Sequence, residues 1–361
     1  MDAAARPHAQ PPDAPVTVRV DDPGEIAAAL PQLLGFRPRE SIVLVALTRP
    51  DGGRLGLTVR MDIPPPRHAA AVARALTRAV RSARPRGVVL AVVSDEDDVG
   101  SGPSRDLPHR PLVAEVLRAL PGVAVPWVLL VRGGRWWCYD CPDSCCDPGA
   151  GTALPSGTTA LAAAAVATGV VVAEDRADLA QRIARPSDFD RAAMVAACVT
   201  AASARADAVV ASGWDAAAED AWTAIRAAVE RCRPGGPGAP LADDEVARIL
   251  WALRDTGVRD RALELALGPD AAAAEVLWTE CTRRALTPLD AAPATLLAVS
   301  AWLRGDGAMA NVALDRALDG QPDYVLAGLL AEGLARCLPP ADLRAMIRAT
   351  LGSAADDGPG G

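Results

Sequence analysis

The sequence predicts an α/β unit, built on a mixed sheet flanked by helices, followed by an all-α helical unit. The 361 residues are more than twice the roughly 150 residues of a typical domain, which favours two domains. In the first half, apolar runs typical of buried strands alternate with helical patterns, whereas the second half carries helical patterns throughout. We expect the α/β unit over residues 16–186 and the helical unit over 187–350. We expect residues 1–15 and 351–361 to be disordered.

The first half contains strand and helix signals in alternation. Asp51-Gly52-Gly53 is a turn signal, so the strands on either side of it are expected to pair as a hairpin. Residues 148–173 are read as a buried helix running into a strand, because their apolar part is too short to span a membrane. Strands are expected at 16–20, 41–47, 54–63, 87–93, 123–131 and around Trp136, and helices at 23–34, 67–84 and 111–120.

The second half reads as helices joined by short turns. Ser187 and Asp190 form a start signal similar to a capping box, and residues 233–240 are rich in Pro and Gly, as in a linker. Helices are expected at 187–211, 214–232, 243–256, 258–267, 271–285, 293–304, 306–319, 323–337 and 340–350.

One window has the spacing of a tetratricopeptide repeat. Small and apolar residues stand where the two helices of such a hairpin meet. An ordinary helical hairpin explains the same residues, and there is no second copy of the pattern. The residues are Leu297, Ala298, Gly305, Ala310, Leu314, Ala317 and Pro322.

Charge and composition narrow the classes of partner. The net charge is −8, and all 37 basic residues are Arg. A general nucleic-acid partner is therefore not expected, because neutralising phosphates dominates that affinity. Six Arg and no acid occur between Arg67 and Arg86, which fits a solvated helix face or an anion-docking face. No secretory signal or membrane span is read from the sequence, so we expect a cytoplasmic protein with reduced thiols and no membrane partner.

Four cysteines lie within nine residues, after two tryptophans. Cys138, Cys141, Cys145 and Cys146 supply the number of ligands that a structural zinc site needs. The adjacent pair strains a shared tetrahedron, so a reduced Cys-rich turn or redox chemistry are alternatives. Zinc is the one cofactor that the sequence suggests.

A second candidate is the acidic segment 94–98, which follows the predicted strand 87–93. Ligands of open α/β sheets bind beyond the carboxyl ends of the strands, and carboxylates such as Asp95 can hold a cation there. Arg60 and Asp62 end their own strand and are added as candidates, although an Arg–Asp ion pair explains them equally. Phosphate-loop, dinucleotide-binding, zinc-protease and nucleophile-elbow motifs are missing from the sequence.

Several motifs, in order, resemble the actinobacterial "domain of unknown function 4192" family. They are Asp22-Pro23-Gly24-Glu25, the run at 33–38 with Ser41, the run at 60–64, Arg135-Trp136-Trp137 with the cysteines, and the run at 302–307 with Asn311. Arg37 and Arg135 stand in these motifs and are added as candidate ligand-binding residues. The family pattern has Ser where Cys138 stands, which weakens a four-cysteine zinc site. The resemblance implies a cytoplasmic actinobacterial protein and supplies no reaction.

The sequence therefore favours an interaction or regulatory module that binds another protein through its helical unit. The alternative is an enzyme, or a metal- or small-ligand-binding protein, that uses the strand-end carboxylates and the Cys loop. Convergence of Arg60, Asp62, Asp95 and the Cys loop on one cleft would favour the alternative.

Overall fold

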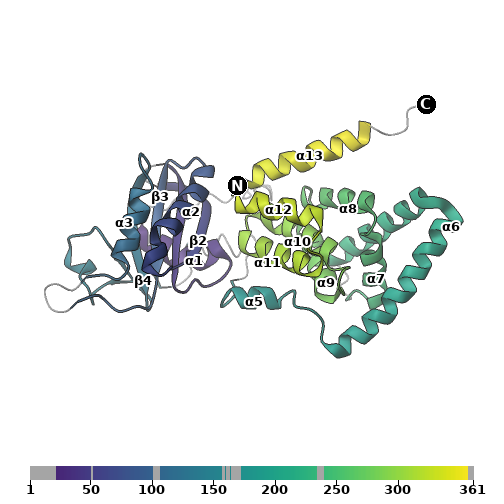
Figure 1. Ribbon diagram of the computed structural model, residues 1–361, viewed down its shortest axis with the longest axis horizontal. Helices are drawn as coiled ribbons and strands as arrows, with labels where there is room; N and C mark the ends of the chain where they lie inside the picture. Colours follow the sequence, from purple (N-terminus) through teal and green to yellow (C-terminus); the bar gives the residue numbers. More distant parts are fainter. Residues whose placement is uncertain are drawn as a thin grey trace, which may run out of the picture. The chain divides into compact units, whose positions relative to one another are not determined.

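The computed structural model (Figure 1) describes residues 22–49, 52–100, 106–156, 159, 163, 172–233 and 240–356. The chain divides into two compact units. The sheet unit comprises Met1–Leu33 and Arg39–Val171, and the helical unit comprises Leu34–Pro38 and Val172–Gly361.

The sheet unit is built on a mixed six-stranded sheet in the order β2-β1-β3-β4-β5-β6. β3 and β4 are parallel, and the other neighbours are antiparallel. This confirms the predicted fold class of the first half. Strand β6 was not predicted, because two residues are too few to show the alternation of apolar and polar residues that marks a strand. The strands are β1 (Ser41–Arg49), β2 (Gly52–Asp62), β3 (Gly87–Val93), β4 (Ala124–Arg132), β5 (Arg135–Cys138) and β6 (Thr152–Ala153).

Helices α1 (Pro23–Leu34), α2 (Ala69–Ser82) and α3 (Arg110–Arg118) complete the sheet unit, with a short 3-10 turn, η1 (Pro66–His68), before α2. α2 and α3 pack on one face of the sheet, because their apolar residues join alternate residues of β1, β3 and β4 in one core. The arginines of α2 are on its exposed side, as a solvated helix face requires.

The helical unit contains long and short helices with tight turns between them. Residues 187–211 and 214–232, predicted as two helices, form one stretch that is interrupted at Gly213, where φ is 84° and ψ is 170°. The elements are α5 (Arg176–Gln181), α6 (Asp188–Cys232), α7 (Asp243–Ala252), α8 (Thr256–Ala262), the 3-10 helix η4 (Leu263–Ala266), α9 (Ala271–Arg284), α10 (Ala291–Arg304), α11 (Gly307–Gly320), α12 (Val325–Ala335) and α13 (Pro340–Asp356).

The helical unit begins earlier than the expected residue 187, because the segment from Val172 contacts helices of this unit. Arg176 forms an ion pair with Asp315 of α11 at 2.9 Å. Backbone hydrogen bonds also join Ala173 to Gly35 and Arg37, so residues 34–38 belong to this unit. At the other end, α13 runs to Asp356, beyond the helix end expected at residue 350.

α10 is the centre of the helical unit, since Ala291–Leu303 are all buried between their neighbours. Ala310 and Ala313 of α11 have no exposed surface, as expected where two helices approach closely. Gly305 ends α10 with a left-handed φ of 95°, and the Asp306 carboxylate accepts the Met309 N–H at the start of α11. These features form a tight helical hairpin, while the tetratricopeptide-like reading stays a prediction.

Some expectations concern parts of the chain that the structure does not describe. The N-terminal residues 1–15 and the predicted strand 16–20 lie outside the described residues. So do most of the run 157–171 and the centre of the linker, residues 234–239.

Candidate functional site

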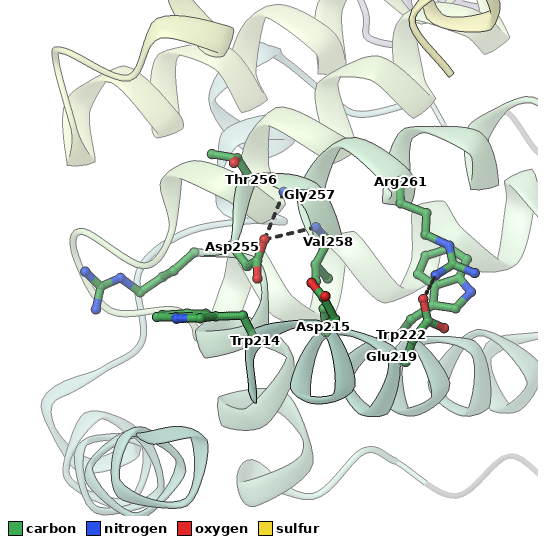
Figure 2. A pocket seen from close by; sticks show the side chains of 11 residues that line it. Trp214, Asp215, Glu219, Trp222, Asp255, Thr256, Gly257, Val258 and Arg261 are labelled. Carbon is green, nitrogen blue, oxygen red and sulfur yellow. Dashed lines mark hydrogen bonds and ion pairs between the residues drawn. The ribbon is translucent and has the colours of Figure 1, made fainter. Parts of the chain in front are cut away.

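A cavity of about 610 Å³ opens on the helical unit between the second half of α6 and the region around α8. Figure 2 shows Trp214, Asp215, Glu219 and Trp222 on α6, with Thr256, Gly257 and Val258 on the facing segment. Arg254, Asp255, Arg261 and Ala218 complete the lining. The lining combines two indoles, two guanidinium groups and three carboxylates.

Trp214 lies at the mouth of the cavity because of the break in α6. Gly213 adopts a left-handed φ that other residues rarely tolerate, and Trp214 follows it directly. The Trp214 residue is 67% exposed, an unusual position for the largest apolar side chain. The other indole, Trp222, is 8% exposed and forms a fixed wall of the cavity.

Three of the charged groups are held in place. The Arg261 guanidinium lies 4.4 Å from the centre of the Trp222 ring and forms an ion pair with Glu219 at 2.6 Å. The Asp255 carboxylate accepts the Gly257 N–H at 2.9 Å and thereby caps α8 (Figure 2). Arg205 pairs with the same carboxylate at 3.2 Å. These groups give the cavity a preformed wall and floor.

Two charged groups remain available at this cavity. Arg254 is exposed and stacks over the Trp251 ring at 4.7 Å, and no carboxylate among the described residues pairs with it. Asp215 is likewise exposed and forms no ion pair within the described part of the chain. The lining contains no Ser, Cys or His, and Thr256 supplies its one hydroxyl group.

The predicted residues Arg60, Asp62 and Asp95 lie at one end of the sheet, since Ser41 is in register with both Asp62 and Val93. The side chains of Arg60 and Asp62 have local partners there. Arg60 pairs with Asp62 at 2.5 Å and donates to the Ser41 hydroxyl at 2.8 Å. The Asp95 backbone N–H donates to Glu40 at 2.8 Å, and the Asp95 side chain is exposed. The ion-pair reading of Arg60 and Asp62 matches this geometry.

The same sheet end contains a polar network that joins Ser94 and Glu96 of the predicted acidic segment to Glu40 and His109, which the sequence did not single out. The buried Ser94 hydroxyl lies 2.8 Å from the Glu40 carboxylate and 2.9 Å from Nε2 of His109. The Glu96 carboxylate lies 3.1 Å from the same ring nitrogen. A serine–histidine–carboxylate relay needs both ring nitrogens, so this network lacks that geometry.

Backbone strain accompanies the network. Glu40 and His109 have φ of 38° and 59°, in a region that residues other than Gly seldom occupy. Glu40 and Ser94 are 54 residues apart, so no local sequence pattern predicts that their side chains are in contact. The network ties together the start of β1, the end of β3 and the start of α3.

Arg37 and Arg135, the remaining predicted ligand-binding residues, lie in different units. Arg37 forms an exposed ion pair with Glu174 at 3.2 Å. Arg135 donates to the backbone carbonyls of Ala150 and Gly151 at 2.9 and 2.7 Å. It therefore holds the loop whose Gly151 packs against the Trp137 ring.

The Cys loop leaves the sheet away from the end that carries Asp95, because β5 runs antiparallel to β4 and Cys138 pairs with Leu129. The Cys138 N–H donates to Sγ of the buried Cys146 at 3.2 Å, and the Cys141 thiol lies 3.7 Å from the Asp143 carboxylate. The Cys145 side chain lies outside the described part. Among the described side chains, no group of three His, Cys, Asp or Glu could hold a metal, so zinc stays a prediction.

One described helix is long and apolar enough to cross a membrane. It covers Arg191–Cys232 of α6, and 17% of its most apolar window is buried. Length and composition are the whole of this finding, and a helix of a soluble protein passes the same test.

The fold and the cavity define a two-unit protein, in which a mixed α/β sheet unit precedes a helical unit that carries a cavity. The chain belongs to the family described as Domain of unknown function (DUF4192), whose model matches residues 23–341. This confirms the resemblance seen in the sequence motifs. No curated protein and no solved structure matches the chain.

Proposed function

We propose that this protein is a protein-binding module whose helical unit recognises a segment of a partner at the cavity between α6 and α8. The observation that carries the proposal is Trp214, which is 67% exposed at the mouth of that cavity. Trp and Arg are enriched among the few residues that carry most of the binding energy at protein interfaces, and such residues cluster in well-packed pockets. Trp214, Arg254 and the Trp222 wall provide this combination (Figure 2).

The chemistry of the lining indicates the kind of segment that fits. An apolar or aromatic side chain of the partner would cover the Trp214 indole, and a carboxylate would pair with Arg254. Asp215 disfavours a second acidic residue next to the first. A short segment with one acidic residue beside an apolar or aromatic one satisfies these groups.

The separation of the other candidate residues supports a binding role. At the sheet end Asp62 pairs with Arg60, the Asp95 carboxylate is exposed, and the Cys loop leaves the sheet elsewhere. The convergence on one cleft that the enzyme reading required is therefore missing among the described side chains.

Selection from a random peptide library displayed on phage tests the proposal. The full chain is the bait, and Trp214→Ala is the bait for counter-selection. We expect enriched peptides with an acidic residue next to an aromatic one, whose affinity falls at least tenfold in Trp214→Ala and in Arg254→Ala. Met346→Ala is the matched control, because Met346 is also exposed, at 57%, but lies on α13. The proposal fails if no peptide is enriched, or if the selected peptides bind Trp214→Ala as well as the wild type.

A further inference from the structure

The first half of α6 exposes an apolar face that no described part of the chain covers. Val195, Val199 and Val210 are 44%, 67% and 88% exposed. Figure 1 shows α6 as two helical arms joined at a bend, with the first arm along the edge of the helical unit. Valines on a helix are ordinarily turned to a core, so an exposed row of them marks an interaction surface.

One set of the exposed and half-buried apolar residues follows a heptad pattern. Their spacing alternates between three and four residues over about two and a half heptads, which places them along one seam of the helix. No member is charged, and each is a small residue that allows a second helix to approach closely. The seam residues are Ala192, Val195, Val199, Ala202, Ala206 and Val209, all of them exposed or half-buried.

The order of large and small residues makes this seam complementary to itself. If a second α6 lies antiparallel, with the two-fold axis between Thr200 and Ala201, every layer of the seam pairs one Val with one Ala. Alternation of large and small residues across facing positions is what close packing requires. An isologous interface also demands that each pair occur twice. The pairs are Ala192 with Val209, Val195 with Ala206, and Val199 with Ala202.

We propose that the protein forms a homodimer through this antiparallel pairing of α6. The outer flank of the seam carries Ala196, Ser203 and Val210, so the pairing buries no charge on that side. On the inner flank, Arg205 is already held by the Ala217 carbonyl and by Asp255, at 2.6 and 3.2 Å. The proposal goes beyond the peptide-binding function, because the cavity residues from Trp214 onward lie past the seam.

The charges of α6 favour a second copy over a lipid surface. From Asp188 to Asp220 there are six acidic residues and two basic ones. Helices that lie on membranes are instead rich in Lys and Arg on their polar face. Anionic lipids would thus repel the acidic residues around the seam. The seam itself is uncharged and can pack against the same seam of a second copy.

The length of the seam sets the strength that we expect. From Ala192 to Val209 the helix rises about 26 Å at about 1.5 Å per residue. A single pair of helices of this length falls at the small end of specific interfaces. We therefore expect a dimer whose dissociation constant is in the micromolar range.

Sedimentation equilibrium of the full chain between about 1 and 200 µM tests the proposal. Val199→Glu places a charge in two layers at the middle of the seam and should leave a monomer throughout this range. Ala204→Glu adds the same charge at an exposed position on the other side of the helix and should leave the dimer intact. Both positions are exposed, and equal melting temperatures would show that the fold is retained.

Exchanging the two central residues tests the antiparallel register. Val199→Ala alone creates Ala–Ala layers, and Ala202→Val alone creates Val–Val layers, so each should weaken the dimer several-fold. The double variant Val199→Ala/Ala202→Val restores one Val and one Ala in every layer and should recover the wild-type association. A general loss of apolar surface would not be repaired in this way.

Three results would overturn the proposal: a monomer at 200 µM, a dimer that Val199→Glu leaves unchanged, and double-variant association no better than that of the weaker single variant. Flotation with vesicles of phosphatidylglycerol and phosphatidylcholine tests the alternative that the seam binds a lipid surface. If a monomer binds them and Val199→Glu abolishes the binding, the seam is a lipid surface and the dimer is rejected. None of these results affects peptide selection at Trp214, so the two proposals fail separately.

Discussion

The two units bury different chemistry in their cores. In the sheet unit, the central strands β1 and β3 are aliphatic, and Ile42–Leu47 and Val88–Val92 are at most 3% exposed. In the helical unit, the buried core also contains charged groups, Asp290 at 0% and Arg316 at 8% exposure. Helices and sheets both satisfy their backbone hydrogen bonds, so the difference lies in the side chains that each core contains.

The buried pair is only partly satisfied. The Arg316 and Asp290 side chains approach to 3.1 Å, and Arg316 also donates to the carbonyls of Thr282 and Ala285. Within the described part of the chain, Oδ1 of Asp290 and Nε of Arg316 have no hydrogen-bond partner. Burial lowers the pKa of Arg316. The sheet unit also holds an ion pair with a buried carboxylate, Asp98 with Arg132 at 2.9 Å, but this pair lies outside the aliphatic core of the central strands. In the helical unit the pair joins the core helices α10 and α11, so the stability of this unit depends on keeping the two charges together.

Breaking the pair should have the largest effect. Asp290→Ala leaves the Arg316 charge buried without a counter-charge, and it should lower the free energy of unfolding of the helical unit by about 3–5 kcal/mol. Urea unfolding followed by the fluorescence of the buried Trp278 and Trp302 measures this. Asp315→Ala removes a 63% exposed partner of Arg176 and should cost less than about 1 kcal/mol.

The double variant Asp290→Ala/Arg316→Met separates the burial of a lone charge from the loss of contacts. It should recover most of the stability, because no charge is then left in the core. Equal losses in Asp290→Ala and Asp315→Ala would contradict the importance of the buried pair.

In the sheet unit, close packing should be the sensitive feature. A Cβ on Gly151 would lie 2.5 Å from the Trp137 ring, at a φ of 68°. Gly151→Ala should therefore cost about 2–4 kcal/mol, from the left-handed backbone and from overpacking together. Gly133 has a φ of 53° but open space around it, so Gly133→Ala isolates the backbone cost of about 1–2 kcal/mol. If chemical denaturation gives equal losses for both, the packing of Gly151 on Trp137 is unimportant.

The smallest effect should come from an exposed ion pair in the sheet unit. Hydrogen bonds from Arg110 lower the pKa of Asp106 in the folded state. A lowered carboxyl pKa stabilises the fold above the unfolded pKa of about 3.9, and this contribution is lost as the pH falls through the folded value. Asp106→Asn should therefore reduce stability at pH 7 and flatten its decline below pH 4.

The loss at pH 7 should be less than about 1 kcal/mol, because both side chains are more than 40% exposed. Unfolding by urea at pH 7, 4 and 3 measures it, with the exposed Asp97→Asn as the control. An unaltered pH profile in Asp106→Asn would show that the pair contributes nothing.

The sequence predicted local structure well where one residue type decides it. The apolar runs of β1 and β3 and the helix Pro23–Leu34 lie where the sequence placed them. Gly213 separates two helices at the predicted point, since glycine alone adopts its φ easily. The start of the helical unit at Val172 was missed, because an ion pair to Asp315 and a backbone bridge to Phe36 decide it.

The sequence by itself determined the fold class and the family, because periodicity and short motifs are properties of neighbouring residues. Only the tertiary structure decided that Trp214 is exposed beside a cavity, that Ser94 meets Glu40 and His109, and that Asp290 meets Arg316. Each of these contacts joins residues from separate elements. Their meeting depends on how whole helices and strands pack, which no local pattern of residues encodes.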